Sequence, residues 1–117
     1  MALDPSKPLV ASVFRSPPVL LLFDPLTGAE RKRLPTCGDA DDVFFDPRRV
    51  RIYVSCGAGE VTVFDHRIAD WSRLDNIATA SGARTSLFVP ELDRLFVAER
   101  AGLLGSEAAI RVYQPSP

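Results

Sequence analysis

Short apolar stretches separated by tight turns run along the whole chain. The segment FFDPRRVRIYVSCGAGEVTVFD, residues 44–65, contains three of them. Ile, Tyr, Phe and Val dominate these stretches, and such residues favour β-strands. Asp-Pro and Gly-Ala-Gly steps divide them, because proline presets φ for a turn and glycine adopts the backbone conformations of tight hairpins. The pattern predicts antiparallel strands joined by hairpins.

The stretches recur along the chain. Residues 43–55 (VFFDPRRVRIYVS) align with residues 87–98 (LFVPELDRLFVA), and the start (MALDPSKPLVAS) fits the same frame. The alignment places Phe44 on Phe88, Ile52 near Leu95, Val54 on Val97, and Asp4-Pro5 on Asp46-Pro47. Asp4 and Asp46 are 42 residues apart, and Asp46 and its counterpart Pro90 are 44 apart. A repeated unit of this size predicts several copies of one supersecondary element.

A second column of residues supports the repeat. Three segments end in an aromatic residue followed by a polar one: Phe23-Asp24, Phe64-Asp65 and Tyr113-Gln114. Two columns at a period of about 40–45 residues are typical of four-stranded β-propeller blades. We therefore expect one all-β segment with repeats at 1–38, 39–82 and 83–117, the last without its fourth strand.

Each repeat can be divided into strands. The first strand is expected at 43–45 and 86–89, the second at 50–56 and 94–99, and the polar outer strand at 29–36 and 71–79. The third strand is nearly apolar in VLLLF (19–23), as expected for a sheet covered on both faces. Residues 91–109 also fit a helical stripe. The repeat and the glycines at 102 and 105 favour a strand followed by a long loop instead.

RIYVSCGAGEVTVFD and GARTSLFVPELDRLFVA resemble the YVTN-type β-propeller repeat proteins, with YVSC (53–56) where that family's motif stands. The resemblance implies propeller blades, covers essentially the whole chain, and says little about activity. Repeat 1 departs from the pattern, since LVASVF (9–14) has no aromatic residue before Phe14. Family members usually have about seven blades and many are exported. The chain resembles the C-terminal third of such a protein.

Strands in groups of four, four and three make about 2.75 blades, whereas propellers close with four to eight. Such an arc leaves two apolar blade faces open, and apolar faces of that size mark interfaces. We expect self-association, with two copies closing a ring of about six blades. A piece of a larger propeller and a collapsed, different small β structure are the alternatives.

Charge and hydropathy bear on which classes of partner the chain could bind. The net charge is −1 and no basic stripe is visible, and Arg31, Lys32 and Arg33 are interpreted as a solvated strand face. Nucleic-acid binding needs a concentrated cationic surface, and the longest apolar run, 19–23, is far too short to span a bilayer. We expect neither a nucleic-acid nor a membrane partner, although another protein partner stays open. No signal-peptide pattern begins this chain, and localisation stays unknown.

The cysteines and aromatic residues suggest packing roles. Cys37 and Cys56 lie 19 residues apart without a metal-ligand spacing. Buried or half-buried separate thiols are favoured, whereas a disulfide and a redox or metal role stay open. His66 is expected on an exposed loop, and Trp71 is expected to pack at the head of an outer strand.

The densest polar cluster, CGDADD (37–42), precedes the first strand of repeat 2, and GARTS (82–86) is its counterpart in repeat 3. Innermost strands of a propeller begin near the central channel. The candidate ligand-binding residues are therefore Asp39, Asp41, Asp42, Arg84, Thr85 and Ser86, facing one another across neighbouring blades. Three carboxylates suit a hard cation, whereas turn capping and pairing with Arg84 is the structural alternative.

No catalytic fingerprint such as GxSxG, HExxH or a P-loop is present in the sequence. The first hypothesis is accordingly a non-catalytic scaffold module, without a cofactor or a resident metal, that binds another copy of itself. The second hypothesis is a small-ligand or metal-binding propeller. The third, a remnant of a lactonase-like propeller hydrolase, rests on fold analogy.

Overall fold

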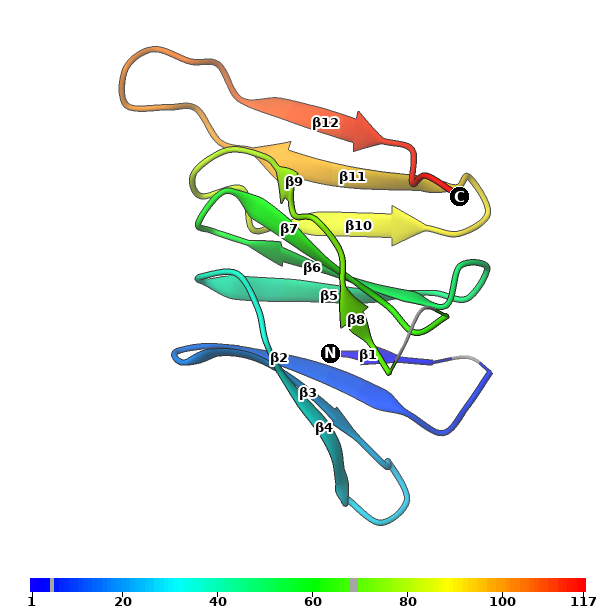
Figure 1. Ribbon diagram of the computed structural model, residues 1–117. Coiled ribbons are helices and arrows are strands. Elements are labelled where there is room, and N and C mark those ends of the chain that lie inside the picture. Colours follow the sequence, from blue (N-terminus) through cyan, green and yellow to red (C-terminus); the bar gives the residue numbers. More distant parts are fainter. Residues whose placement is uncertain (5, 68–69) are drawn as a thin grey trace.

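The computed structural model describes residues 1–4, 6–67 and 70–117, which form antiparallel sheets and no helix (Figure 1). The first sheet has the order β1 (Ala2–Leu3), β2 (Val10–Arg15), β3 (Pro18–Phe23), β4 (Glu30–Pro35). The second has β5 (Ala40–Asp46), β6 (Arg51–Cys56) and β7 (Glu60–Asp65), with the short strands β8 (Ser72–Arg73) and β9 (Ile77–Ala78) both paired with β7. The third has β10 (Ser86–Val89), β11 (Arg94–Glu99) and β12 (Ala109–Tyr113).

The three sheets are stacked in chain order, from β1–β4 at the bottom of Figure 1 to β10–β12 at the top. The sheets contact one another near their first strands: β5 of the second sheet contacts β1 and β2 of the first sheet and β10 of the third. The sheets stay separate and do not close into a barrel. None of the described residues belongs to a helix that could cross a membrane.

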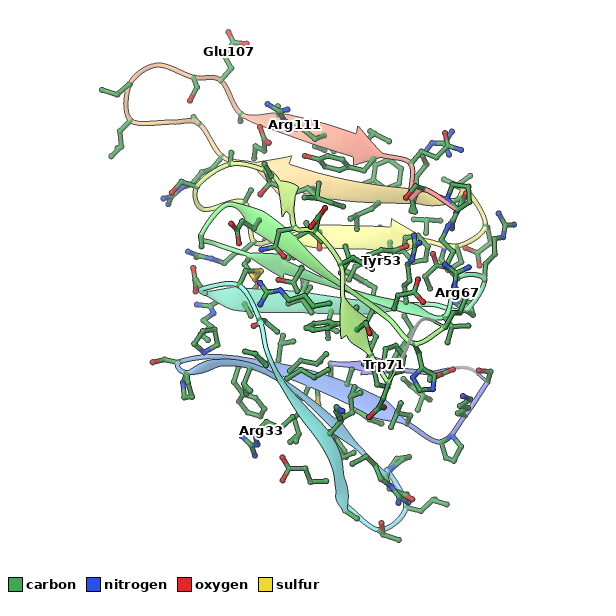
Figure 2. All side chains as sticks on the ribbon, viewed as in Figure 1. Arg33, Tyr53, Arg67, Trp71, Glu107 and Arg111 are labelled. Atoms are coloured by element: carbon green, nitrogen blue, oxygen red, sulfur yellow. A yellow bond between two sulfur atoms is a disulfide. The ribbon has the colours of Figure 1, made fainter. Side chains whose placement is uncertain are left out.

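Two apolar cores hold the stack together, and side chains fill the spaces between the sheets (Figure 2). The first core joins sheets one and two through residues such as Leu20, Leu22, Ile52 and Phe64. The second joins sheets two and three and includes Tyr53, Val61, Val63, Leu95 and Val97. The middle strand β6 is buried at every position. A sheet covered on both faces needs no alternation of apolar and polar residues, which explains why RIYVSC reads as a nearly continuous apolar run.

Strand register shows which residues are equivalent in the three sheets. The cross-strand rows that match one another are Leu3–Val10–Phe23, Phe45–Ile52–Phe64 and Phe88–Leu95–Tyr113. The sequence alignment of Ile52 with Leu95 and Val54 with Val97 agrees with these rows. The alignment of Phe44 with Phe88 is wrong by one residue, because Phe45 pairs with Ile52 as Phe88 pairs with Leu95.

The segment 91–109 contains a strand followed by a long loop and no helix, as the repeat predicted. Residues 94–99 form β11, and residues 100–108 form a loop that leads to β12. Pro5, in the predicted Asp4-Pro5 turn, lies outside the described residues. The Asp4 carboxylate accepts hydrogen bonds from the backbone N–H and the hydroxyl of Ser6.

The expected outer strand at 71–79 is interrupted. Within residues 71–79 only the short strands β8 and β9 pair with β7 as strands, and residues 74–76 lie between them. Asp75 and Asn76 are poor strand formers. The Asn76 side chain donates to the Glu60 carboxylate at 2.7 Å, and the Leu74 N–H still bonds the Val63 backbone oxygen at 2.8 Å.

The expectation of two separate thiols is wrong. Cys37, between β4 and β5, is bonded to Cys56 at the end of β6, and their Cα atoms are 5.9 Å apart. Both residues are buried. The bond ties the connection between sheets one and two to the centre of the second sheet.

His66 is half-buried, which corrects the expected exposed loop position. Its ring stacks on Trp71 at a centroid distance of 4.7 Å. Trp71 is buried against Phe45, edge to face at 6.3 Å, and thus packs as expected (Figure 2). Aromatic contacts of this kind stabilise the core by about 0.5–1.5 kcal/mol beyond area burial.

Candidate functional site

Asp39 and Arg84, from the two predicted polar segments, meet between sheets two and three. Asp39 precedes β5 and Arg84 precedes β10, and Arg84 Nη2 lies 2.6 Å from Asp39 Oδ2. Asp39 has a positive φ of 59°, a conformation that aspartate tolerates in turns. Its backbone oxygen accepts the Gly57 N–H at 2.8 Å. The start of β5 is thereby fixed against the β6–β7 turn.

The other candidates divide among different partners. The side chain of Asp41 pairs with Arg15 at the end of β2, a contact that the sequence did not predict. Arg15 Nε also lies 3.5 Å from Asp39 Oδ1, and the contact with Asp41 raises the pKa of the Arg15 guanidinium. Asp42 accepts the backbone N–H of Ser86 at 2.9 Å.

Ser86 and Thr85 complete the set. Ser86 Oγ lies 2.7 Å from Ser55 Oγ on β6. Thr85 is exposed, and its backbone oxygen accepts the Ala98 N–H at 3.0 Å. The described residues gather no group of three or more histidine, cysteine or carboxylate side chains arranged to hold a metal. The polar segments therefore link the three sheets, with Arg15, Asp39 and Arg84 as the chain of ion pairs.

Gly57 leaves the space that the Asp39–Arg84 pair occupies. A Cβ at this position would overlap the Asp39 carboxylate and approach Arg84 Nε at 3.0 Å. We expect Gly57→Ala to break this partly exposed ion pair and to lower the free energy of unfolding by about 1 kcal/mol or less. Urea titration measures the change. In an Arg84→Ala background the same substitution should cost less, since the Asp39–Arg84 ion pair is already absent and cannot be lost, and an unchanged cost would refute this coupling.

A second polar cluster, at the opposite ends of the strands, was missed by the sequence reasoning. Arg49 is buried and pairs with Asp46 at 3.0 Å and, through two nitrogens, with Asp93 at 2.6 and 2.9 Å. The contact with Asp93 raises the pKa of Arg49, and Arg49 in turn lowers the pKa of Asp93. The signal was the aspartate that ends β5, followed three residues later by an arginine.

The same cluster holds the segment after β12. Arg51 donates from Nε to Asp65 at 2.8 Å, and from its two terminal nitrogens to the backbone oxygens of Ser116 at 2.6 Å and Pro117 at 3.1 Å. Arg67 and Arg51 hold the pKa of the buried Asp65 carboxyl far below its usual range. Burial, together with the Asp46 carboxylate, raises the pKa of Tyr53. The charges of this cluster are thus paired with one another, and its arginines also hold the backbone of residues 115–117.

The outer face of the third sheet is an open apolar surface. We name it the β10–β12 face and define it by Leu87, Phe96, Ala98, Ile110 and Val112. In the second sheet the equivalents of Ile110 and Val112 are Val61 and Val63, which are 0% and 5% exposed. Ile110 and Val112 are 69% and 55% exposed. Positions that a neighbouring sheet covers in the second sheet are therefore open in the third.

The face of the first sheet that points away from the second sheet is also apolar and open to water. We name it the β1–β3 face and define it by Leu3, Val10, Phe14, Leu21 and Phe23. Leu3 is 62% exposed, whereas its equivalents in the next two sheets, Phe45 and Phe88, are 9% and 5% exposed. The stack thus ends in two different apolar faces, of the same two kinds that pack together inside it.

Comparison with known proteins supports the fold. No protein-family model matches the chain, and no curated protein sequence matches it. Among solved structures, hydrazine synthase from Kuenenia stuttgartiensis, a β-propeller-containing protein, is similar with a TM-score of 0.82 and 14% identity. The match covers 97% of this chain and 32% of that chain. At this identity the likeness shows a β-propeller-like all-β fold and nothing about activity.

Proposed function

We propose that this chain is a β-propeller segment that acts as a non-catalytic interaction module, with a second copy of itself as its immediate partner. In this proposal the three sheets are YVTN-type blades. The β10–β12 face of one copy packs on the β1–β3 face of the other, and the reverse contact closes a ring of about six blades. The observation that carries the proposal is the exposure of Ile110 and Val112 at positions whose equivalents are buried one sheet earlier.

The internal packing supports the choice of partner. Sheet one packs on sheet two, and sheet two on sheet three, through faces of these same two kinds. Inside the chain, the face equivalent to the β10–β12 face packs on the face equivalent to the β1–β3 face. A second copy would therefore cover each open face with the same kind of surface. Water contact with such apolar faces costs roughly 25 cal/mol for every Å² that association would bury.

A ligand-binding role has less support. Asp39 and Asp41 are paired with arginines, and Asp42 accepts a backbone N–H, so the candidate carboxylates have partners from the chain itself. The scaffold function therefore makes better use of these residues, as ties between neighbouring sheets.

Complementary variants test the head-to-tail arrangement. Val112→Asp places a charge on the β10–β12 face, and Phe14→Asp places one on the β1–β3 face. Each variant alone should be monomeric, because every contact in the ring uses one face of each kind. An equimolar mixture keeps one intact pair of faces and should form a heterodimer, measured by co-purification of differently tagged copies. If Phe14→Asp stayed dimeric alone, two like faces would be in contact and the arrangement would be wrong.

A further inference from the structure

Among residues 1–4, 6–67 and 70–117, none pairs as a strand with the outer edge of the third sheet. In the first sheet β3 carries β4, and in the second β7 carries β8 and β9. At the equivalent place β12 is the last strand of its sheet in the described part of the chain. Its outward N–H and C=O groups form a template for another strand.

This edge also lacks the features that protect the edge of the first sheet. Natural edge strands avoid pairing through charges, proline, bulges or short length. The strand β4 (ERKRLP) has four charged residues and a proline, and its pairing with β3 shifts register near Phe23. The strand β12 (AIRVY) has one charged residue, Arg111, which pairs with Glu99 at 2.6 Å (Figure 2).

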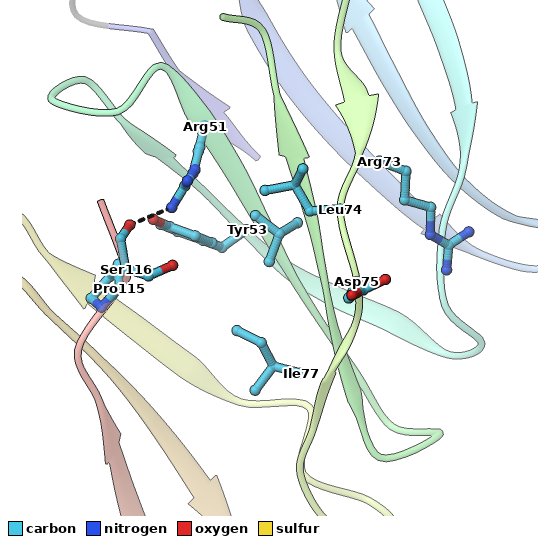
Figure 3. A pocket seen from close by; sticks show the side chains of 9 residues that line it. Arg51, Tyr53, Arg73, Leu74, Asp75, Ile77, Pro115 and Ser116 are labelled. Carbon is cyan, nitrogen blue, oxygen red and sulfur yellow. Dashed lines mark hydrogen bonds between the residues drawn. The ribbon is translucent and has the colours of Figure 1, made fainter. Parts of the chain in front are cut away.

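A groove runs beside this edge. Its volume is 470 Å³, and Figure 3 shows it between the segment after β12 and the outer segment of the second sheet. Its lining includes Leu74 and Ile77 from the outer segment of the second sheet, Tyr53 and Val63 from β6 and β7, and residues 115–116. Tyr113, at the end of β12, packs with Leu74 and Ile77 against the second core. A fourth strand of the third sheet would extend its inward side chains into this groove.

We propose that the β12 edge and this groove bind an extended, amphipathic peptide strand from another protein, antiparallel to β12. Backbone hydrogen bonds to β12 supply affinity, and apolar side chains at alternate positions fill the groove over Leu74 and Ile77. The chain itself supplies the template for this ligand, because its first and second sheets carry such strands, β4 and β8–β9, at the same place. The site does not depend on self-association, which uses the β10–β12 face and not this edge.

A peptide copied from the outer segment of the second sheet tests the proposal. The probe is a fluorescein-labelled WSRLDNIAT peptide, the sequence of residues 71–79, titrated with the intact chain and followed by anisotropy. We expect saturable binding below about 1 mM. The same peptide with Leu74→Pro should bind at least about tenfold more weakly, because proline removes a ladder donor and clashes with continuous pairing.

Amide hydrogen exchange on the complex locates the peptide. Amides of residues 109–113 should gain protection on addition of WSRLDNIAT, while amides of β4 keep theirs. The wild-type chain suffices for this measurement, so a variant that fails to fold does not affect it. Protection at β7 without protection at β12 would mean that the peptide only replaces the chain's own outer segment, and would overturn the proposal. A titration without saturable binding of WSRLDNIAT would also overturn the proposal, and so would equal affinities for this peptide and its Leu74→Pro version.

Discussion

Asp65→Asn should lower the free energy of unfolding by about 3–5 kcal/mol, the cost of breaking a buried ion pair by removing one charge. Asp65 is fully buried and accepts bonds from Arg51 Nε at 2.8 Å and Arg67 Nη2 at 2.9 Å. The asparagine amide would place N–H groups against one guanidinium or the other, and the buried Arg51 would lose its counter-charge. Equilibrium urea denaturation measures the loss.

Asp24→Asn is the matched control. Asp24 follows β3 in the first sheet as Asp65 ends β7 in the second, and it pairs with Arg31 at 2.9 Å. The Arg31 side chain is 60% exposed, so water screens this pair, and its loss should destabilise the chain far less than the loss of the Asp65 charge. Equal losses for the two variants would contradict the account of the buried cluster.

The pH dependence of stability has the same origin. The pKa of Asp65 is lowered in the folded chain, first by Arg67 and then by Arg51. An unfolded aspartate titrates near pH 3.9. The contribution of Asp65 is therefore complete above about pH 4 and is lost as the pH falls further towards the folded pKa. The wild-type chain should lose more stability than Asp65→Asn between about pH 4 and 2, and parallel curves would refute this role.

Removal of the Cys37–Cys56 disulfide should lower the free energy of unfolding by about 3 kcal/mol. The bond closes a loop across a sequence separation of 19 residues, and chain-entropy models give about 3 kcal/mol for loops of this size. The double variant Cys37→Ala, Cys56→Ala removes the bond and leaves no unpaired buried thiol. Urea denaturation of both chains measures the difference.

Chemical reduction of the disulfide with a thiol reagent during urea denaturation provides the control for this prediction. Reduction should lower the free energy of unfolding of the wild-type chain about as much as the double substitution does. It should leave the free energy of unfolding of the double variant unchanged. An alanine variant as stable as the oxidised wild type would show that the bond does not constrain the unfolded chain.

Local sequence features predicted the strands well, because hairpins depend on short-range chemistry. The Val and Ile stretch of β6, the Gly-Ala-Gly turn that follows it, and the strand β11 all lie close to their expected places. The one-residue error that placed Phe44 on Phe88 arose because both Phe44 and Phe45 are aromatic. Cross-strand pairing, which sequence does not show, decides between them.

Contacts between sheets were harder to predict. Asp39 and Arg84 were expected to face each other, since each precedes the first strand of its sheet, and they do. The pairing of Asp41 with Arg15 was missed, because it depends on how the end of β2 lies against the second sheet. The disulfide was not favoured, since a separation of 19 residues does not reveal that Cys37 returns to the end of β6.

The absolute mass of the intact chain in solution, measured by light scattering on a size-exclusion column, tests the central claim most directly. Two copies in a closed ring predict a single species at twice the 12.8 kDa of one chain, stable over a hundredfold dilution of about 100 μM protein. A monomer at every concentration would contradict closure by self-association, because the β10–β12 and β1–β3 faces would then remain open to water.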